Sequence, residues 1–156
     1  MIPGRSVGWN RVRPAPKRAK PMADAKRQRI LIIEGNEKHK NILAARLRDS
    51  GFDVNTAKDG LEGWNAVRRY NPDLVILDIM LSGLDGHQVC RMIKFDRKLS
   101  AIPVVVLTSR DLEEVAELAK QVKADAFCVK TTKMPILIDI IRKLIERKRN
   151  QNPTEG

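Results

Sequence analysis

The sequence predicts an α/β fold in which a doubly wound parallel sheet carries helices on both faces. Five short apolar runs alternate with five segments of helical periodicity between residues 29 and 148, as expected for repeated strand–helix units. The runs at 74–77 and 104–107 are apolar at every position, which is typical of strands covered on both faces, as in parallel sheets. Right-handed crossovers then distribute the helices over the two faces.

Each element of this fold has its own signal in the sequence. The predicted strands span 29–33, 52–57, 74–77, 104–107 and 126–129, and the predicted helices span 36–51, 58–70, 86–96, 111–123 and 134–148. Asn36 and Asp59 are candidate N-caps, and Gly51 is a candidate stop signal. The apolar positions expected to face the sheet are Ile42, Leu43 and Leu47 in the first helix, and Ile136, Ile140, Ile141 and Leu144 in the last.

The net charge of +11 is concentrated outside the predicted fold. Residues 1–29 carry nine Lys/Arg and one acidic residue, whereas residues 30–146 carry 18 basic and 17 acidic residues. We therefore expect a basic disordered tail over 1–29, a folded domain over 30–146 and a polar tail over 147–156. A nearly neutral domain argues against nucleic-acid binding by the folded part. Two origins stay open for residues 1–21, a native tail or a segment upstream of a start at Met22.

The composition is that of an ordinary soluble domain. Of 156 residues, 42% are hydrophobic and 31% charged, which is enough apolar material for a core. No apolar run approaches the roughly 18 residues of a membrane span, and no signal-peptide pattern opens the chain, so we expect a cytoplasmic location. Cys90 and Cys128 lie far apart and are expected to be buried thiols. His39 and His87 lie on predicted helices without partner ligands, so we expect surface or capping roles.

Polar residues directly follow four of the apolar runs. They are Glu34, Asp78, Thr108 and Lys130. Parallel strands of one sheet end on one edge, so these two carboxylates, one hydroxyl and one ammonium should converge. A single polar residue at a strand end is ordinary loop chemistry, but four of them predict a shared polar site.

Residues 30–146 resemble the receiver domain of bacterial two-component response regulators. The matching motifs are ILIIEGNE, LVILDIMLSGLDG, IPVVVLTS and ADAFCVK. The resemblance implies a flavodoxin-like, CheY-like strand order of 2-1-3-4-5. It also implies that Asp78 accepts a phosphoryl group from a sensor histidine kinase or phosphotransfer protein, with Lys130 and Thr108 contacting the phosphoryl oxygens. Such a domain is a signalling module and not an enzyme in its own right.

The resemblance further implies a bound Mg²⁺ and a conformational switch. Glu34, Asp78 and the backbone carbonyl of Met80 are the implied ligands of the ion. Thr108 and Phe127 are the implied switch residues, although a plain packing role is an equal alternative for Phe127. The surface of the last helix and of the fourth strand–helix unit is the implied binding face for a downstream protein. We see no output domain after the last helix, so we expect the output to be a protein contact or a further phosphotransfer.

The sequence departs from the family pattern at Gly35, at Thr131 and at Ser82, which stands in place of a loop proline. Gly35 stands where the family usually has a second acid, so the pocket has two carboxylates and one lysine. We therefore expect weaker Mg²⁺ binding, less like-charge repulsion and less dependence on the ion. Thr131 replaces a proline that is typically cis, so we expect a trans bond and a slightly re-aimed Lys130. Met80 and Arg110 flank the site, and their bulk predicts slow loss of the phosphoryl group.

One alternative from a different functional class stays open. A pseudo-receiver keeps the fold and acts as an interaction module without phosphorylation, and the missing acid at Gly35 is consistent with it. Retention of Asp78, Thr108 and Lys130 favours phosphorylation. Other classes fit less well: a hydrolase of the haloacid-dehalogenase type needs an acid two residues after Asp78, and a P-loop motif is absent.

Overall fold

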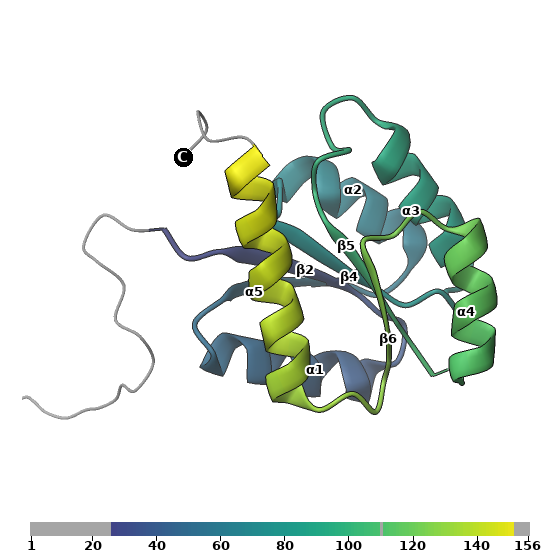
Figure 1. Cartoon of the computed structure of the whole chain (residues 1–156), viewed down its shortest axis with the longest axis horizontal. Coiled ribbons are helices and arrows are strands. Elements are labelled where there is room, and N and C mark those ends of the chain that lie inside the picture. Colours follow the sequence, from purple (N-terminus) through teal and green to yellow (C-terminus); the bar gives the residue numbers. More distant parts are fainter. Residues whose placement is uncertain (1–25, 110, 152–156) are drawn as a thin grey trace, which may run out of the picture.

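The computed structural model of the chain describes residues 26–109 and 111–151 (Figure 1). In chain order, its elements are β2 (Arg29–Ile33), α1 (Glu37–Asp49), β3 (Asp53–Ala57), α2 (Gly60–Tyr70), β4 (Leu74–Leu77), α3 (Gly86–Phe95), β5 (Val104–Thr108), α4 (Leu112–Gln121), β6 (Ala126–Val129) and α5 (Met134–Gln151). Most of the expected basic tail, Arg110 and residues 152–156 lie outside the described residues.

The strands form one parallel sheet in the order β3-β2-β4-β5-β6. Counted among the strands alone, this is the order 2-1-3-4-5, so the predicted fold class is confirmed. The direction of winding reverses between β2 and β4, because β3 is added on one side of β2 and β4 on the other. Sites of doubly wound sheets lie beside such a reversal, at the carboxyl ends of the strands.

Two apolar layers, one on each face of the sheet, hold the helices in place. Alternate residues of a strand point to opposite faces, so Leu74 and Ile76 of β4 pack toward α1 and α5, and Val75 and Leu77 pack toward α2 and α3 (Figure 1). All four side chains are buried. The continuous apolar run of this strand therefore reflects two covered faces, as expected from the sequence.

The two predicted N-caps and the predicted stop signal have those roles in the structure. Asn36 and Asp59 accept hydrogen bonds from the backbone N–H groups of His39 and Glu62, both at 2.8 Å. Gly51 follows α1 with a φ of 100°, a conformation that favours glycine. The two capping bonds satisfy N–H groups that the first turn of a helix leaves unpaired.

The prediction of which apolar side chains of the first and last helices face the sheet is wrong at two positions. Ile42 and Ile136 are 48% and 54% exposed, whereas Leu137 and Ile145 of α5 are buried. Periodicity predicts the spacing of a stripe, but consecutive helical residues lie about 100° apart around the axis. A one-residue error in the rotation of the helix therefore moves a side chain from the sheet to solvent.

Helix α5 continues past the predicted helix end at residue 148 and ends at Gln151. The first part of the expected polar tail, residues 147–151, therefore belongs to this helix. Lys and Arg are good helix formers, and Lys148 and Arg149 lie in the last turn, where cations interact favourably with the helix dipole.

The two cysteines are buried and form no disulfide. Burial raises the pKa of Cys90 to about 11 and raises the pKa of Cys128 above its usual value. Both thiols therefore stay protonated at neutral pH and act as packing groups, as expected. Within the described ranges, no helix is both long and apolar enough to cross a membrane.

Candidate functional site

The four predicted strand-end residues lie together at one edge of the sheet. Glu34 follows β2, Asp78 follows β4, Thr108 ends β5 and Lys130 follows β6. The Lys130 ammonium donates to Asp78 Oδ2 at 3.0 Å, and it lies 2.9 Å from Glu34 Oε1 and 3.1 Å from Glu34 Oε2. Glu34, Asp78 and Thr108 are all buried. We call these four residues the acid pocket.

Backbone hydrogen bonds of the sheet fix the positions of these side chains. The N–H of Glu34 donates to the last carbonyl of β3, and the N–H of Asp78 donates to the last carbonyl of β2, both at 3.0 Å. The N–H of Lys130 donates to the Thr108 carbonyl at 2.7 Å. Each bond continues the pairing of a strand by one residue, so the four residues keep the alignment of the parallel strands.

A further residue, His39, contacts the acid pocket, and this contact was not predicted from the sequence. Its Nδ1 atom lies 2.9 Å from Glu34 Oε1, a contact that the expected surface or capping role of His39 did not include. The Asn36 N–H donates to Glu34 Oε2 at 2.9 Å. A signal was available: Asn36, two residues after Glu34, caps α1, so the first turn of α1, which includes His39, must lie beside that strand end.

The charges of the pocket are unequally stabilised. Burial alone would raise the pKa of Glu34, but hydrogen bonds from Lys130, a backbone N–H and His39 outweigh it and hold the pKa below its usual value. Burial raises the pKa of Asp78 above its usual value, the Glu34 charge adds to the rise, and the Met80 N–H and Lys130 oppose it. Burial lowers the pKa of Lys130, but the two carboxylates outweigh it and raise that pKa. Glu34 is thus held as an anion more firmly than Asp78.

The loop after β4 brings the backbone of Asp78 against the start of α3. The Met80 N–H donates to Asp78 Oδ1 at 3.0 Å, and the Gly86 N–H donates to the Ile79 carbonyl at 3.2 Å. A Cβ atom at position 86 would lie 2.6 Å from the Asp78 carbonyl oxygen and 2.5 Å from Ile79 Cα. Only glycine therefore allows α3 to begin this close to the chain that carries Asp78.

The other predicted residues lie near the pocket or outside the described residues. Met80 is largely exposed, and Phe127 is half-buried against the apolar layer on the α2 and α3 side. The described peptide bonds are all trans, including the bond before Thr131, as expected. Arg110 lies outside the described residues.

The oxygen atoms of the acid pocket are hard donors of the kind that Mg²⁺ accepts. The Glu34 and Asp78 carboxylates have the chemistry that the ion requires, but in the part of the chain that the structure describes no three His, Cys, Asp or Glu side chains are grouped to hold a metal. Position 35 has room for one more donor, because a Cβ atom at Gly35 would meet only the Lys58 carbonyl oxygen, at 3.4 Å. The pocket therefore fits Mg²⁺ with two carboxylates and can accommodate a third.

Comparison with known families identifies the class of the protein. Residues 30–142 match the model of the response regulator receiver domain. The chain therefore belongs to the receiver domain family of two-component response regulators, in agreement with the fold and with the strand-end residues.

Two curated relatives illustrate how this chain compares with longer proteins. It is 35% identical over 132 residues to the DNA-binding response regulator MtrA of Mycobacterium tuberculosis, an alignment that covers 85% of this chain and 56% of MtrA. It is 33% identical over 118 residues to the transcriptional regulatory protein AfsQ1 of Streptomyces coelicolor, covering 76% of this chain and 51% of AfsQ1. The chain thus spans about half the length of these relatives.

Solved structures share the same fold. The BeF3-activated N-terminal receiver domain of Klebsiella pneumoniae RstA superimposes with a TM-score of 0.68 at 30% identity, covering 76% of this chain and 98% of that one. NtrX from Brucella abortus gives a TM-score of 0.72 at 28% identity, covering 81% of this chain and 29% of NtrX. Vibrio cholerae CheY4, at 20% identity, gives 0.70, covering 76% of this chain and 99% of that one, and supports the fold alone.

Proposed function

We propose that Asp78 accepts a phosphoryl group from a sensor histidine kinase or a phosphotransfer protein. The observation that carries the proposal is the 3.0 Å contact between Asp78 Oδ2 and the Lys130 ammonium at the carboxyl end of a central strand. Asp78 is 7% exposed. An incoming phosphoryl group would therefore meet the carboxylate in a pocket with little water, beside a fixed cation.

In the proposed step, a carboxylate oxygen of Asp78 attacks the phosphorus atom of a phosphohistidine. An O–P bond forms, the P–N bond of the donor breaks, and the electron pair of that bond stays on the imidazole nitrogen. The chemistry depends on positioning and on charge stabilisation at the phosphoryl oxygens. Lys130 is the proposed cation for those oxygens, and the Thr108 hydroxyl is the proposed hydrogen-bond donor.

The proposed metal site is weak. Mg²⁺, when bound, would neutralise charge on the phosphoryl oxygens, and its proposed ligands are Glu34, Asp78 and the Met80 carbonyl. The Glu34 carboxylate already accepts hydrogen bonds from three neighbouring groups, which leaves it less capacity for a metal. We therefore propose that Lys130 supplies a larger share of the charge stabilisation here than in a pocket with three carboxylates.

Thr108 and Phe127 are the proposed switch residues. Thr108 is fully buried at the end of β5, and Phe127 pairs with Val106 on the neighbouring strand. Movement of Thr108 toward a phosphoryl group would open space beside Phe127 and allow its ring to change rotamer. The signal would then reach the surface formed by α4, β6 and the first half of α5.

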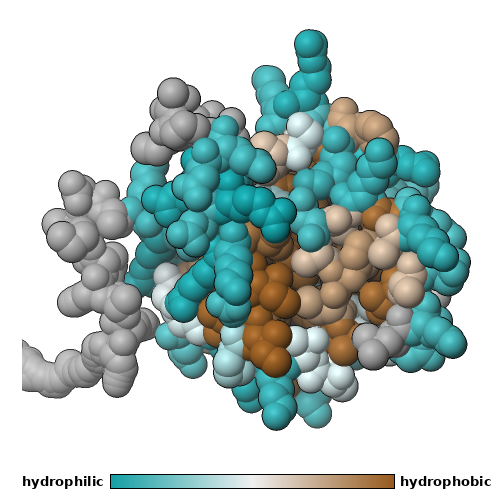
Figure 2. Space-filling model, viewed as in Figure 1, coloured by the Kyte–Doolittle hydropathy of each residue, from teal (hydrophilic) through white to brown (hydrophobic). Residues whose placement is uncertain are grey.

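That surface is suited to a protein partner. Figure 2 shows apolar side chains gathered over β6 and the first half of α5, whereas the second half of α5 is hydrophilic. Ile136, on this part of α5, is largely exposed. We propose a downstream protein as the partner, because apolar exposed patches of this kind mark protein interaction sites.

Intact-mass measurement after incubation with acetyl phosphate and Mg²⁺ tests the proposal. The wild-type chain should gain the mass of one phosphoryl group, and Asp78→Asn should gain none. Asp85→Asn is the matched control, since Asp85 caps α3 in the same loop and asparagine caps helices equally well. This control should be labelled like the wild type. Labelling of Asp78→Asn would place the acceptor elsewhere and overturn the proposal.

The pseudo-receiver is the second candidate function, and one observation favours it. Both carboxylates of the acid pocket already have a partner within the protein. Lys130 hydrogen-bonds both of them, and His39 hydrogen-bonds Glu34. A pseudo-receiver would show no added mass in the wild type or in Asp78→Asn. It would still bind its partner through the surface of α4, β6 and α5.

A further inference from the structure

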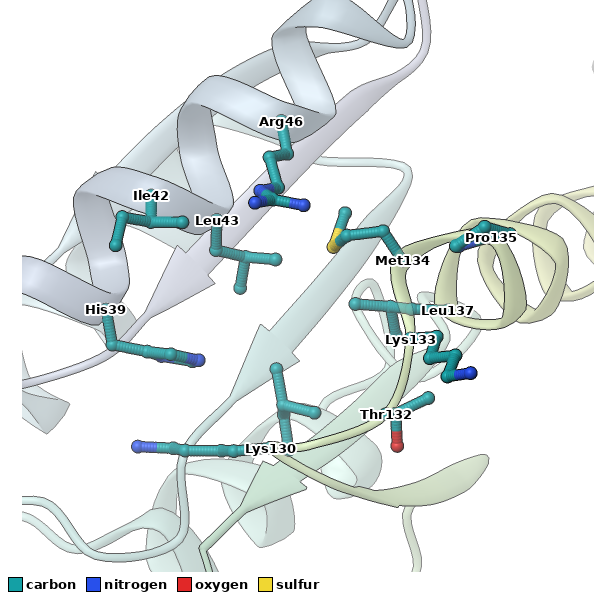
Figure 3. Close-up of a pocket in the computed structure, with 11 residues that line it drawn as sticks. His39, Ile42, Leu43, Arg46, Lys130, Thr132, Lys133, Met134, Pro135 and Leu137 are labelled. Atoms are coloured by element: carbon teal, nitrogen blue, oxygen red, sulfur yellow. The ribbon is translucent and has the colours of Figure 1, made fainter.

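A cleft opens beside the acid pocket, between α1 and the segment that leads from β6 into α5 (Figure 3). Its volume is about 470 Å³, which lies in the range of roughly 300–1,000 Å³ typical of small-molecule sites. We call it the α1–α5 cleft. It shares the first turn of α5 with the surface proposed for the downstream partner, but it faces α1.

The floor of the α1–α5 cleft is apolar. Leu43 of α1 and Leu137 of α5 are buried at its base, and Met134 is half-buried beside them. Ile42 lines the same space and is 48% exposed. An apolar body placed here would cover side chains that the fold leaves in contact with water.

The rim of the cleft is basic. Figure 3 shows the Arg46 guanidinium lying over the space between α1 and Met134; Lys133 lies on the opposite wall, with its ammonium directed away from Arg46. Among the described residues, neither the Arg46 guanidinium nor the Lys133 ammonium has an ion-pair partner, and no acidic residue lines the cleft. By contrast, Lys40 and Lys143 each pair with an acid of their own helix.

We infer that the α1–α5 cleft binds a small amphipathic anion: a carboxylate, sulfonate or phosphate head on an aliphatic or aromatic body. The head would pair with Arg46 and Lys133, and the body would rest on Leu43, Leu137 and Ile42. An apolar pocket with cationic side chains at its rim can orient such ligands, and the exposed Lys133 side chain is long enough to turn toward the head.

Charge argues against one alternative occupant, the chain's own N-terminal segment. Residues 1–25 contain six Lys/Arg and one acidic residue, so this segment would repel a basic rim. The inference does not depend on phosphorylation of Asp78, because it concerns residues outside the acid pocket. The intact-mass experiment therefore tests the proposed function, and the titration below tests the cleft independently of it.

Fluorescence titration of the full chain with 8-anilinonaphthalene-1-sulfonate tests the inference, with N-phenyl-1-naphthylamine as the matched probe that lacks the sulfonate. The anionic probe should bind with saturation at one site. The double variant Arg46→Ala/Lys133→Ala should weaken it roughly tenfold or more, the factor expected for losing charge-assisted hydrogen bonds. Binding of the neutral probe should be unchanged in that variant, and Ile42→Ser should weaken both probes.

The double variant Arg97→Ala/Lys98→Ala is the matched control. It removes the same charge from an exposed segment after α3 and should bind the anionic probe like the wild type. Equal weakening in this control would show general attraction to a basic protein and overturn the inference. Absence of saturable binding, or an unchanged affinity in Arg46→Ala/Lys133→Ala, would also overturn it. If that variant proves unfolded by circular dichroism, Arg46→Gln replaces it with the same expectation and the same overturning result.

Discussion

The acid pocket and the α1–α5 cleft lie side by side and share His39 and Lys130 as walls, yet they handle charge in opposite ways. In the acid pocket, Lys130 lies within 3.1 Å of both carboxylates. In the cleft, Arg46 and Lys133 flank apolar surface with no acid in the lining. The difference shows that the pocket balances its buried carboxylates with an internal cation, whereas the cations beside the cleft have no acidic partner in its lining.

The largest effect should come from removing the cation of the pocket. Lys130→Met should lower the free energy of unfolding by about 3 kcal/mol at neutral pH, because two buried carboxylates lose their cation. Lys133→Met, in the cleft, should change it by no more than about 0.5 kcal/mol, as is usual for exposed positions. Urea unfolding of both variants measures the contrast. Equal losses of stability in the two variants would mean that water already screens the charges of the acid pocket. The contrast between the pocket and the cleft would then be wrong.

A smaller effect should follow from restoring an acid at position 35. Gly35→Asp should strengthen Mg²⁺ binding roughly tenfold or more, because a third carboxylate adds a hard ligand and a unit charge near the ion. The backbone there is not in a glycine-specific conformation, and the nearest atom leaves room for a side chain. Calorimetric titration with Mg²⁺ measures the change, and Gly35→Asn is the neutral control of equal size. A similar gain in both variants would exclude charge as its cause.

The smallest effect should be the pH dependence of Asp78. Its folded-state pKa lies above the usual value of 3.8, first because of burial, so the ionised carboxylate costs stability at neutral pH. That cost is full above the folded-state pKa, shrinks as the pH falls toward 3.8 and is absent below it. Asp78→Asn should therefore be more stable than the wild type at pH 7, with an advantage that narrows in acid. Urea unfolding at several pH values tests this, and an advantage that widens in acid would contradict it.

Topology made the acid pocket predictable from the sequence. Residues that directly follow parallel strands must end at one edge, so Glu34, Asp78, Thr108 and Lys130 could be grouped without coordinates. The strand order followed from the family resemblance. The chemical roles of these residues stay predictions, because position alone does not establish phosphoryl transfer.

The α1–α5 cleft was not predictable, because it depends on how helices rotate and diverge. The expected stripe placed Ile42 against the sheet, whereas it is exposed on the cleft. The contact of His39 with Glu34 was missed although the cap at Asn36 places the first turn of α1 beside Glu34, because helical spacing alone does not indicate it. Spacing along one helix carries no information about its neighbours, so only the packed structure shows the cleft.

Gly86 has a consequence for how this protein tolerates change. The chemistry of the acid pocket can be altered one side chain at a time, as the room at position 35 illustrates. At position 86 even a methyl group would collide with the main chain of Asp78 and Ile79. The backbone that carries Asp78 is therefore held in position by the start of α3, and an exchange of the glycine eight residues downstream would displace it.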